Sequence, residues 1–256
     1  MFDLLLACFI HFQIIIIIYT IWLHKGYQHK SIIPSKTLDH IGRFVMWTIA
    51  WGTSSTWLRY SAGSHRMHHM YADTTSDPHS PFYISLKGLL FGGEHNPFFD
   101  HHSPADLENH ALDVPILDDW IQTNIYDIKI KKCSLGIFVP ALIYGLIFGL
   151  PGIVVGLICN LFFIYFLFPF VATWVIHKLG MYRHPKHQFP DRSLNVFPIA
   201  ILLGGVELHS NHHHNPVSVN DAVRWFEFDI GYWYVKLFEK LGLLEINYRI
   251  VDRNKS

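Results

Sequence analysis

A long uncharged stretch constrains the fold of this chain more than any other feature of its sequence. Residues 133–177 contain no Asp, Glu, Lys or Arg. One helix of that length would reach roughly 67 Å, whereas a bilayer core is about 30 Å thick. A Leu-Pro-Gly sequence at residues 150–152 is typical of a turn. We therefore predict a hairpin of two membrane-spanning helices, over residues 134–150 and 153–176.

The N-terminal segment predicts a third span. Residues 2–23 are mostly Leu, Ile, Phe and Val, each of which favours insertion by about 0.3 to 0.6 kcal/mol. No basic residue follows Met1 directly and no small-residue cleavage site is present. An uncleaved span is therefore favoured over a signal peptide.

Residues 38–57 are apolar but contain charges. Asp39 and Arg43 lie in this segment, and one charge near the bilayer centre costs about 2.5 to 3.5 kcal/mol. The few Leu, Ile, Phe and Val residues do not offset that cost. We predict an interfacial or protein-buried helix here, and a single domain over residues 1–256.

The charge balance excludes one large class of function. The chain has 20 Lys and Arg and 20 Asp and Glu among 256 residues, and only 16% of its residues are charged. A neutral chain has no basic field with which to hold a polyanion. Nucleic-acid binding is therefore not expected.

Histidine is the unusual residue, with 19 copies. Eight of them form three groups with regular spacing. HxxHH places three imidazoles on one helix face, and its adjacent pair is splayed by about 100°, so that two neighbours can reach two metal ions. HxxxxH is out of phase for a straight α-helix, so we expect its first member at a helix end and its second in the following turn. The groups are His24 and His29; His65, His68 and His69; and His209, His212 and His213.

The number of histidines predicts two metal ions, because four ligands already complete a tetrahedral zinc site. Imidazole suits several metals, and a pair of irons that activates oxygen is the choice that uses both the metal and the membrane. All three groups must then lie on one side of the bilayer. This requires that residues 38–57 do not cross and that the hairpin crosses twice. Nearby lysines and arginines favour the cytoplasmic face.

The order of these motifs resembles the membrane-bound fatty acid desaturases of the stearoyl-CoA desaturase type, and most closely the bacterial acyl desaturases. The likeness extends over residues 20 to 245. It includes the Asp-Pro-His-Ser-Pro sequence at 77–81, the Gly-Gly-Val-Glu-Leu-His-Ser-Asn-His-His sequence at 204–213 and the Glu-Phe-Asp-Ile-Gly sequence at 227–231.

The resemblance implies an all-α integral membrane fold with a cytoplasmic helical cap that holds a histidine-ligated, non-haem di-iron site. Two iron ions would use O2 and two external electrons to insert a cis double bond into a fatty acyl chain. The implied ligands are the eight grouped histidines, and we expect further support beside them from His79, Glu207 and Asn211. No catalytic residue is expected beyond the ligands.

Two departures from the family pattern stand out. The family has a further span before the first histidine group, so we expect three crossings here instead of four. It also has an Asn-x-x-x-His element whose histidine is a ninth ligand, and here His177 and Met181 occupy those two positions. Thioether suits oxygen-activating iron poorly. We place His177 first as the ninth ligand, with His184 as the other candidate.

The implied partners are a fatty acyl substrate, membrane lipids and a separate electron donor of the ferredoxin, rubredoxin or cytochrome b5 type with its reductase. The expected location is a bacterial inner membrane, with several spans and the site facing the cytoplasm. A lipid hydroxylase would use the same di-iron site and stays open as an alternative. A membrane zinc hydrolase is disfavoured because no HExxH motif is present. A catalytically silent relative that binds lipid or a partner is the third alternative, and Met181 is its only support.

Overall fold

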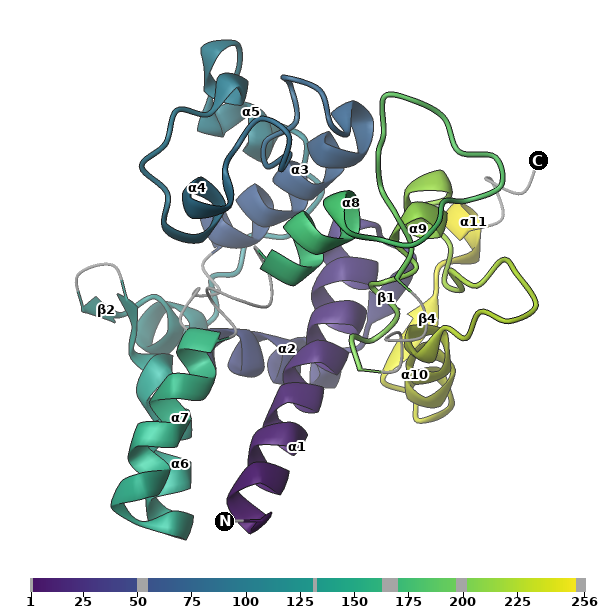
Figure 1. The fold of residues 1–256 in the computed structure, drawn as a ribbon. Helices are drawn as coiled ribbons and strands as arrows, with labels where there is room; N and C mark the ends of the chain where they lie inside the picture. The colour runs from purple at the N-terminus through teal and green to yellow at the C-terminus, as the bar shows by residue number, and fades with distance from the viewer. Residues whose placement is uncertain (1, 50–54, 131–132, 163–169, 197–201, 252–256) are drawn as a thin grey trace.

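A computed structural model describes residues 2–49, 55–130, 133–162, 170–196 and 202–251. Helices dominate this part of the chain, and its strands form two short two-stranded sheets. Helix α1 and the α6–α7 hairpin extend from one end of the molecule, and the remaining elements gather at the other end (Figure 1). The mostly helical fold class is as predicted.

The N-terminal helix is long and continuous. Helix α1 (Phe2–Ile18) runs directly into the π-helix η1 (Tyr19–Gln28). Among the described residues, Phe2–Gln28 is the one helix both long and apolar enough to span a membrane. Phe2 and Leu5 at its beginning are exposed, whereas Ile21 and Trp22 are fully buried. The predicted span over residues 2–23 thus lies within a helix whose far end enters the protein core.

The hairpin is present, but its turn lies elsewhere than predicted. Helices α6 (Phe138–Phe148) and α7 (Leu150–Phe162) pack side by side, and the chain reverses at Gly149, which has a φ of +71°. The predicted turn at residues 150–152 was wrong, because proline is tolerated in the first turn of a helix and glycine is the usual residue just beyond a helix end.

Neither described arm of this hairpin reaches the roughly 20 residues that a span needs. Part of the predicted second arm, residues 163–169, lies outside the described residues. Residues 170–175 are π-helical and continue into α8 (Ile176–Lys178). Three membrane crossings therefore stay a prediction.

The predicted helix over residues 38–57 is divided. Helix α2 (Lys36–Thr48) begins after Ser35, whose side chain accepts a hydrogen bond from the Leu38 N–H, and residues 50–54 lie outside the described residues. Helix α3 (Ser55–Tyr71) includes the end of the predicted segment. The boundary was wrong, since α2 ends at Thr48. Gly52 and the Thr-Ser-Ser-Thr sequence at residues 53–56 are of the types that favour helix ends and N-caps and could have indicated a break.

Helix α2 buries its charge inside the protein. The Arg43 side chain is 2% exposed and forms ion pairs with Asp39, at 3.2 Å, and with Asp119. Asp39 also accepts hydrogen bonds from Trp22 Nε1 at 3.0 Å and from Tyr27 Oη at 2.6 Å. These contacts supply the partners that a buried guanidinium requires, and they attach α2 to the upper part of the N-terminal helix.

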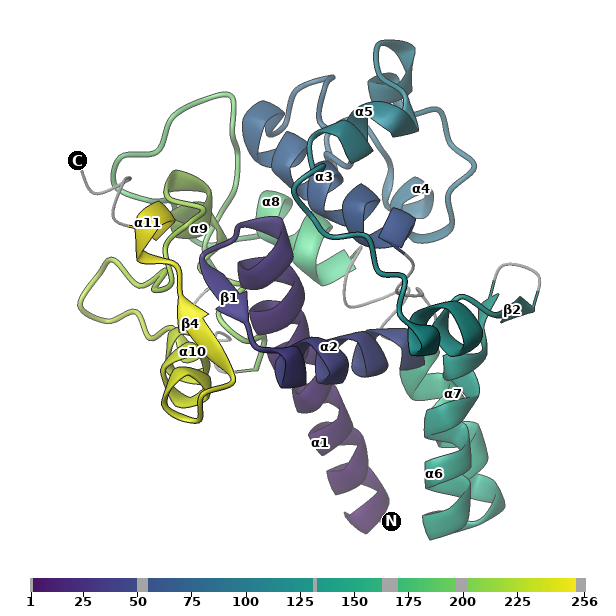
Figure 2. The same cartoon turned by 180° about the vertical axis from the view of Figure 1, so that it is seen from behind.

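The end of the molecule away from the N-terminus is built from short elements around α3. Helix α5 packs on α3, and strand β1 pairs antiparallel with β4, with Ile32 opposite Ile246 (Figure 2). A second small sheet joins β2 and β3. The bounds are β1 (Ile32–Pro34), α4 (Leu86–Phe91), η2 (Pro97–Asp100), α5 (Pro104–Asn109), η3 (Gln122–Tyr126), β2 (Lys129–Ile130), β3 (Cys133–Ser134), η4 (Leu135–Ile137), α9 (His209–His214), α10 (Ile230–Lys240), β4 (Leu244–Ile246) and α11 (Tyr248–Val251).

Candidate metal centre

The π-helix η1 explains the spacing of the first histidine group. The N–H of His29 donates to the carbonyl of His24 at 3.0 Å, which is the i→i+5 hydrogen bond of a π-helix. The wider turn brings residues five apart toward one face, and the two imidazole centroids are 4.8 Å apart. We expected His24 to end the helix and His29 to follow in a turn. The expectation for His24 was wrong, because the helix continues to Gln28 and only widens, whereas His29 does lie in the turn that follows the helix.

Helices α3 and α9 each supply histidines in two directions. His68 and His69 are adjacent on α3 but contact different neighbours, and the same is true of His212 and His213 on α9. The grouped histidines and His177 therefore form two clusters. The first histidine cluster contains His24, His29, His65, His69 and His212, and the second contains His68, His177, His209 and His213.

Nitrogen atoms converge closely in the first histidine cluster. The Nε2 atoms of His24 and His212 are 3.1 Å apart, and those of His29 and His65 are 2.8 Å apart. The Nε2 atom of His69 lies 3.1 Å from Nε2 of both His65 and His212. Five imidazoles from three separate segments thus direct one nitrogen each toward a common point.

The second histidine cluster has the same character. The candidate ligand atoms of its four members all lie within 4.8 Å of one another. The Nε2 atoms of His177 and His209 are 2.9 Å apart, and Nε2 of His213 is buried without a hydrogen-bond partner among the described residues. The two clusters are neighbours, since the rings of His69 and His213 are centred 4.2 Å apart.

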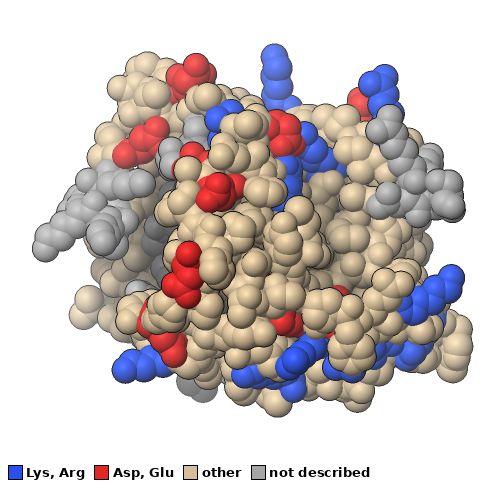
Figure 3. Space-filling model, turned by 90° about the horizontal axis from the view of Figure 1, so that it is seen from above, with Lys and Arg blue, Asp and Glu red and all other residues tan. Residues whose placement is uncertain are grey.

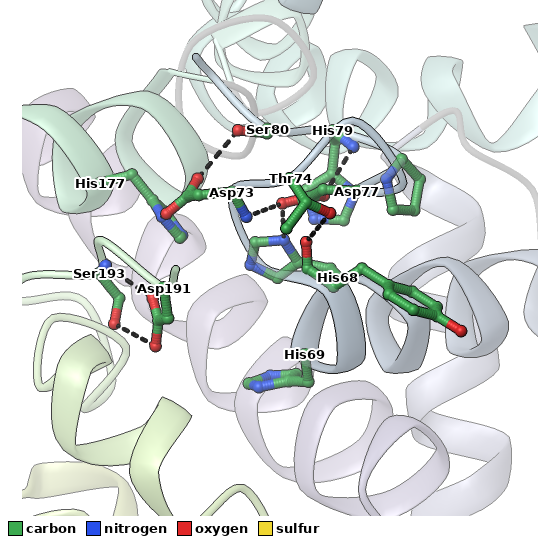
Figure 4. A network of polar contacts seen from close by, with 12 residues as sticks. His68, His69, Asp73, Thr74, Asp77, His79, Ser80, His177, Asp191 and Ser193 are labelled. Atoms are coloured by element: carbon green, nitrogen blue, oxygen red, sulfur yellow. Dashed lines mark hydrogen bonds and ion pairs between the residues drawn. The ribbon is translucent and has the colours of Figure 1, made fainter. Parts of the chain in front are cut away.

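Three carboxylates, two of them fully buried, contact the Nδ1 atoms of histidines in the second histidine cluster. Nδ1 of His68 lies 2.8 Å from Asp77, and Nδ1 of His177 lies 3.0 Å from Asp73. Nδ1 of His213 lies 3.2 Å from Asp191. Figure 4 shows Asp77 beside His68 and Asp73 beside His177, with Asp191 on the neighbouring loop.

These contacts determine which nitrogens carry protons. A carboxylate accepts from the Nδ1–H of a neutral imidazole, which leaves Nε2 as a lone pair. Burial lowers the pKa of His65, His69 and His209 well below the usual value, so these imidazoles are neutral. The lone pairs of converging neutral imidazole nitrogens repel one another when no cation lies between them. The same arrangement binds a cation well. The donor set of each cluster therefore fits a metal ion.

Comparison with known proteins finds several relatives that are named as desaturases. No family model matches the chain. It is 29% identical over 228 residues to an sn-1 stearoyl-lipid 9-desaturase of Synechocystis sp., a match covering 88% of this chain and 65% of that protein. It is 29% identical over 244 residues to the protein of the same name from Anabaena variabilis (92% and 80%), and 26% identical over 225 residues to an acyl-CoA 5-desaturase of Anemone leveillei (88% and 65%). The chain is therefore similar to proteins named as fatty acid desaturases over about nine tenths of its length. It spans just under two thirds of the length of the Synechocystis desaturase.

Met181, which replaces the histidine that the resemblance implies at this position, lies away from the histidine clusters. Met181 is 69% exposed and its side chain lies outside both clusters. His184 is also outside them, because its ring stacks on His214 at 3.8 Å and its Nδ1 accepts from the Lys186 N–H. His177 is the residue that completes the second histidine cluster.

The three residues expected beside the ligands lie in different surroundings. The His79 ring stacks on His68 with centroids 4.4 Å apart. Asn211 instead links α9 to the following loop, through hydrogen bonds to Glu227 and to the Asp221 carbonyl at 2.9 Å. Glu207 is fully buried, and neither carboxylate oxygen has a hydrogen-bond partner among the described residues. Asn211 and Glu207 therefore form no hydrogen bond with a clustered histidine in that part of the chain.

Sequence reasoning assigned no role to the carboxylates that hold the histidines. Asp73 and Asp77 follow the second histidine group at helical spacing, which is a local signal that could have identified them. Asp191 has no such signal, because the loop that carries it meets His213 only through the tertiary fold.

Proposed function

We propose that this chain is an oxygen-dependent fatty acyl desaturase in which the two histidine clusters hold two iron ions. The observation that carries the proposal is the convergence of nine imidazoles, from four separate segments, on two adjacent points. The family relationship supports iron over other imidazole-binding metals.

Bound iron would supply the oxygen activation and hydrogen abstraction that no side chain can perform. The protein's own contribution is to prepare the ligands. Asp73, Asp77 and Asp191 keep the proton on Nδ1 of their histidines, which aims Nε2 at the metal and raises its basicity. Burial of His68, His177 and His209 excludes water from the same point.

We propose a fatty acyl chain as the substrate, since the relatives are named for acyl-lipid and acyl-CoA desaturation. A saturated chain has no polar group at the reacting carbons, so its position depends on an apolar path from the bilayer. Insertion of α1 and the α6–α7 hairpin would place the histidine clusters just outside the membrane. The proposed arrangement has several spans and a cytoplasmic site.

Expression with a ferredoxin and its reductase tests the function. Total fatty acids would be analysed by gas chromatography with mass spectrometry, beside a His212→Ala variant and a matched His101→Ala variant at an exposed position. A new monounsaturated acid that is present with the native chain and with His101→Ala, and absent with His212→Ala, is the expected result. A new hydroxy acid would assign the chain as a hydroxylase, and purified protein without iron would overturn the proposal.

A further inference from the structure

Around the second histidine cluster, positively charged side chains lie near the surface and negatively charged side chains lie deeper in the protein. Residues 170–196 and 202–230 contain five cationic and five acidic side chains. The cations lie at or near the surface, whereas the carboxylates are buried or turned inward. The cationic residues are Lys178, Arg183, Lys186, Arg192 and Arg224, and the acidic residues are Asp191, Glu207, Asp221, Glu227 and Asp229.

Two of the inward carboxylates, Asp191 and Glu227, are occupied by internal contacts. Asp191 contacts His213 and accepts hydrogen bonds from the backbone and hydroxyl of Ser193. Glu227 accepts from Tyr182 Oη at 2.9 Å and from the Val223 N–H at 2.6 Å. They are therefore not available to neutralise the surface, and the five cations present a positive face toward solvent.

Aromatic side chains hold several of these cations in place. The Arg192 guanidinium lies 4.4 Å and the Lys178 ammonium 5.1 Å from the centre of the Phe82 ring. Arg224 lies 4.6 Å from the centre of the Tyr182 ring. Beside it Trp225 is 96% exposed. Arginine and tryptophan together are enriched at the centres of protein interfaces.

The loop that carries Arg192 also reaches the metal centre directly. The Arg192 N–H donates to Asp73, the carboxylate that holds His177, at 2.8 Å. The preceding residue, Asp191, contacts His213. A partner seated on Arg192 would be two hydrogen-bonded contacts from His177, through Asp73, and one contact from His213, through the neighbouring Asp191.

We propose that this basic face (Lys178, Arg183, Lys186, Arg192 and Arg224) is the docking surface for an acidic one-electron carrier protein, with electrons entering through the 191–193 segment. The proposal rests on the proposed function. Figure 3 shows a run of basic side chains along the lower edge of the end opposite the N-terminus, and acidic side chains more frequent in its left half. Complementary charge would steer the encounter and orient the carrier.

The electron balance requires such a partner. Forming one double bond removes two hydrogens from the acyl chain, and reducing O2 to two waters takes up those two hydrogens together with two electrons and two protons. A one-electron carrier must therefore dock twice in each turnover, arriving reduced and leaving oxidised. A surface that depends mainly on charge suits this exchange, because it favours fast association and release.

The test compares two triple variants of the full chain in neutral-lipid nanodiscs. One reverses the face (Lys178→Glu, Lys186→Glu and Arg192→Glu). The matched control reverses three exposed cations elsewhere (Lys87→Glu, Lys240→Glu and Arg249→Glu). The affinity of metal-free protein for an acidic [2Fe–2S] ferredoxin is measured against ionic strength. We expect the face variant to bind at least tenfold more weakly and to lose its salt dependence, and the control to bind within twofold of the native chain.

Iron-loaded protein separates this proposal from the proposed function. With dithionite as the reductant, both triple variants should form product at the native rate, whereas with ferredoxin only the face variant should be slow. Equal ferredoxin binding by both triple variants would overturn the docking surface. The binding measurement is repeated in nanodiscs that contain anionic lipid. If charge reversal changed ferredoxin binding only there, the face would contact lipid headgroups and the proposal would be wrong. Native protein that forms no product even with dithionite would count against the proposed desaturase function. The ferredoxin-binding result would still test the docking surface.

Discussion

His177 and Asp73 are 104 residues apart in the sequence, yet His177 Nδ1 lies 3.0 Å from Asp73 Oδ2 and both side chains are fully buried. The same carboxylate accepts hydrogen bonds from the Arg192 N–H at 2.8 Å and from Ser80 Oγ at 2.9 Å. Asp73 thus joins the loop after α3 to α8 and to the segment before α9. One acidic side chain orients a proposed ligand and connects three parts of the fold.

Replacing Asp73 with Asn should weaken the second metal site. The amide carries no charge and cannot raise the basicity of His177 in the same way, and loss of such a partner typically costs about 10- to 100-fold in metal affinity. Iron measured by plasma mass spectrometry after dialysis should fall toward one ion per chain. Asp100→Asn is the matched control, since Asp100 pairs with His95 at the exposed surface. Equal iron in both variants would contradict the prediction.

The identity of the ninth ligand can be decided by three substitutions. His177→Ala should lower the iron content of purified protein to about one ion per chain, because only the second histidine cluster loses a member. His184→Ala and Met181→Leu should retain two ions, since neither side chain reaches a cluster. If His184→Ala lost iron while His177→Ala kept it, the assignment would be reversed.

Gly63 should tolerate no side chain. A Cβ atom there would lie 1.6 Å from the Leu107 carbonyl oxygen and 2.6 Å from its carbon, so Gly63→Ala must push α5 away from α3. Overpacking of this kind costs about 1–3 kcal/mol, and the thermal unfolding midpoint in detergent should fall by several degrees. Met70→Ala, at an exposed position of the same helix, should change the midpoint little. An unchanged midpoint for Gly63→Ala would show that the two helices are not in this close contact.

Acid should remove the stability that Asp113 provides. Burial raises its pKa, but hydrogen bonds from Arg66 and Lys30 outweigh burial and lower it to about 2. A carboxyl group whose pKa is lower in the folded state stabilises the fold above its unfolded pKa of about 3.9, and this contribution disappears as pH falls toward 2. In metal-free protein, Asp113→Asn should therefore lower the unfolding midpoint most at pH 6 and markedly less near pH 2.5. A pH-independent difference would mean that the ion pairs contribute nothing.

Much of the architecture follows from local patterns. The apolar composition alone is enough to predict the N-terminal helix and the hairpin. The HxxHH spacing correctly indicates that neighbours such as His68 and His69 diverge toward different clusters. The position of the hairpin turn was not predictable by the same reasoning. Pro151 can begin a helix as well as end one, and the left-handed conformation of Gly149 decides between them.

The surroundings of the histidines depend on tertiary structure. Asp191 and His177 are brought to the second histidine cluster by a loop and by a short helix whose paths no periodicity reports. The contacts of Asn211 also differ from those expected from its place in the sequence. Asn211 lies within the last histidine group in the sequence, but its side chain faces the opposite direction and binds Glu227.

The widened turn of η1 makes histidine spacing and helix type depend on each other. With five residues from His24 to His29, a regular α-helix would separate the two rings, and only the π-helical form lets both join the first histidine cluster. Deleting one residue between them would restore α-helical phase for the pair, but it would also rotate and shift the chain that leads into β1 and α2. A change in this spacing would therefore need a matching change in the packing of the segments that follow.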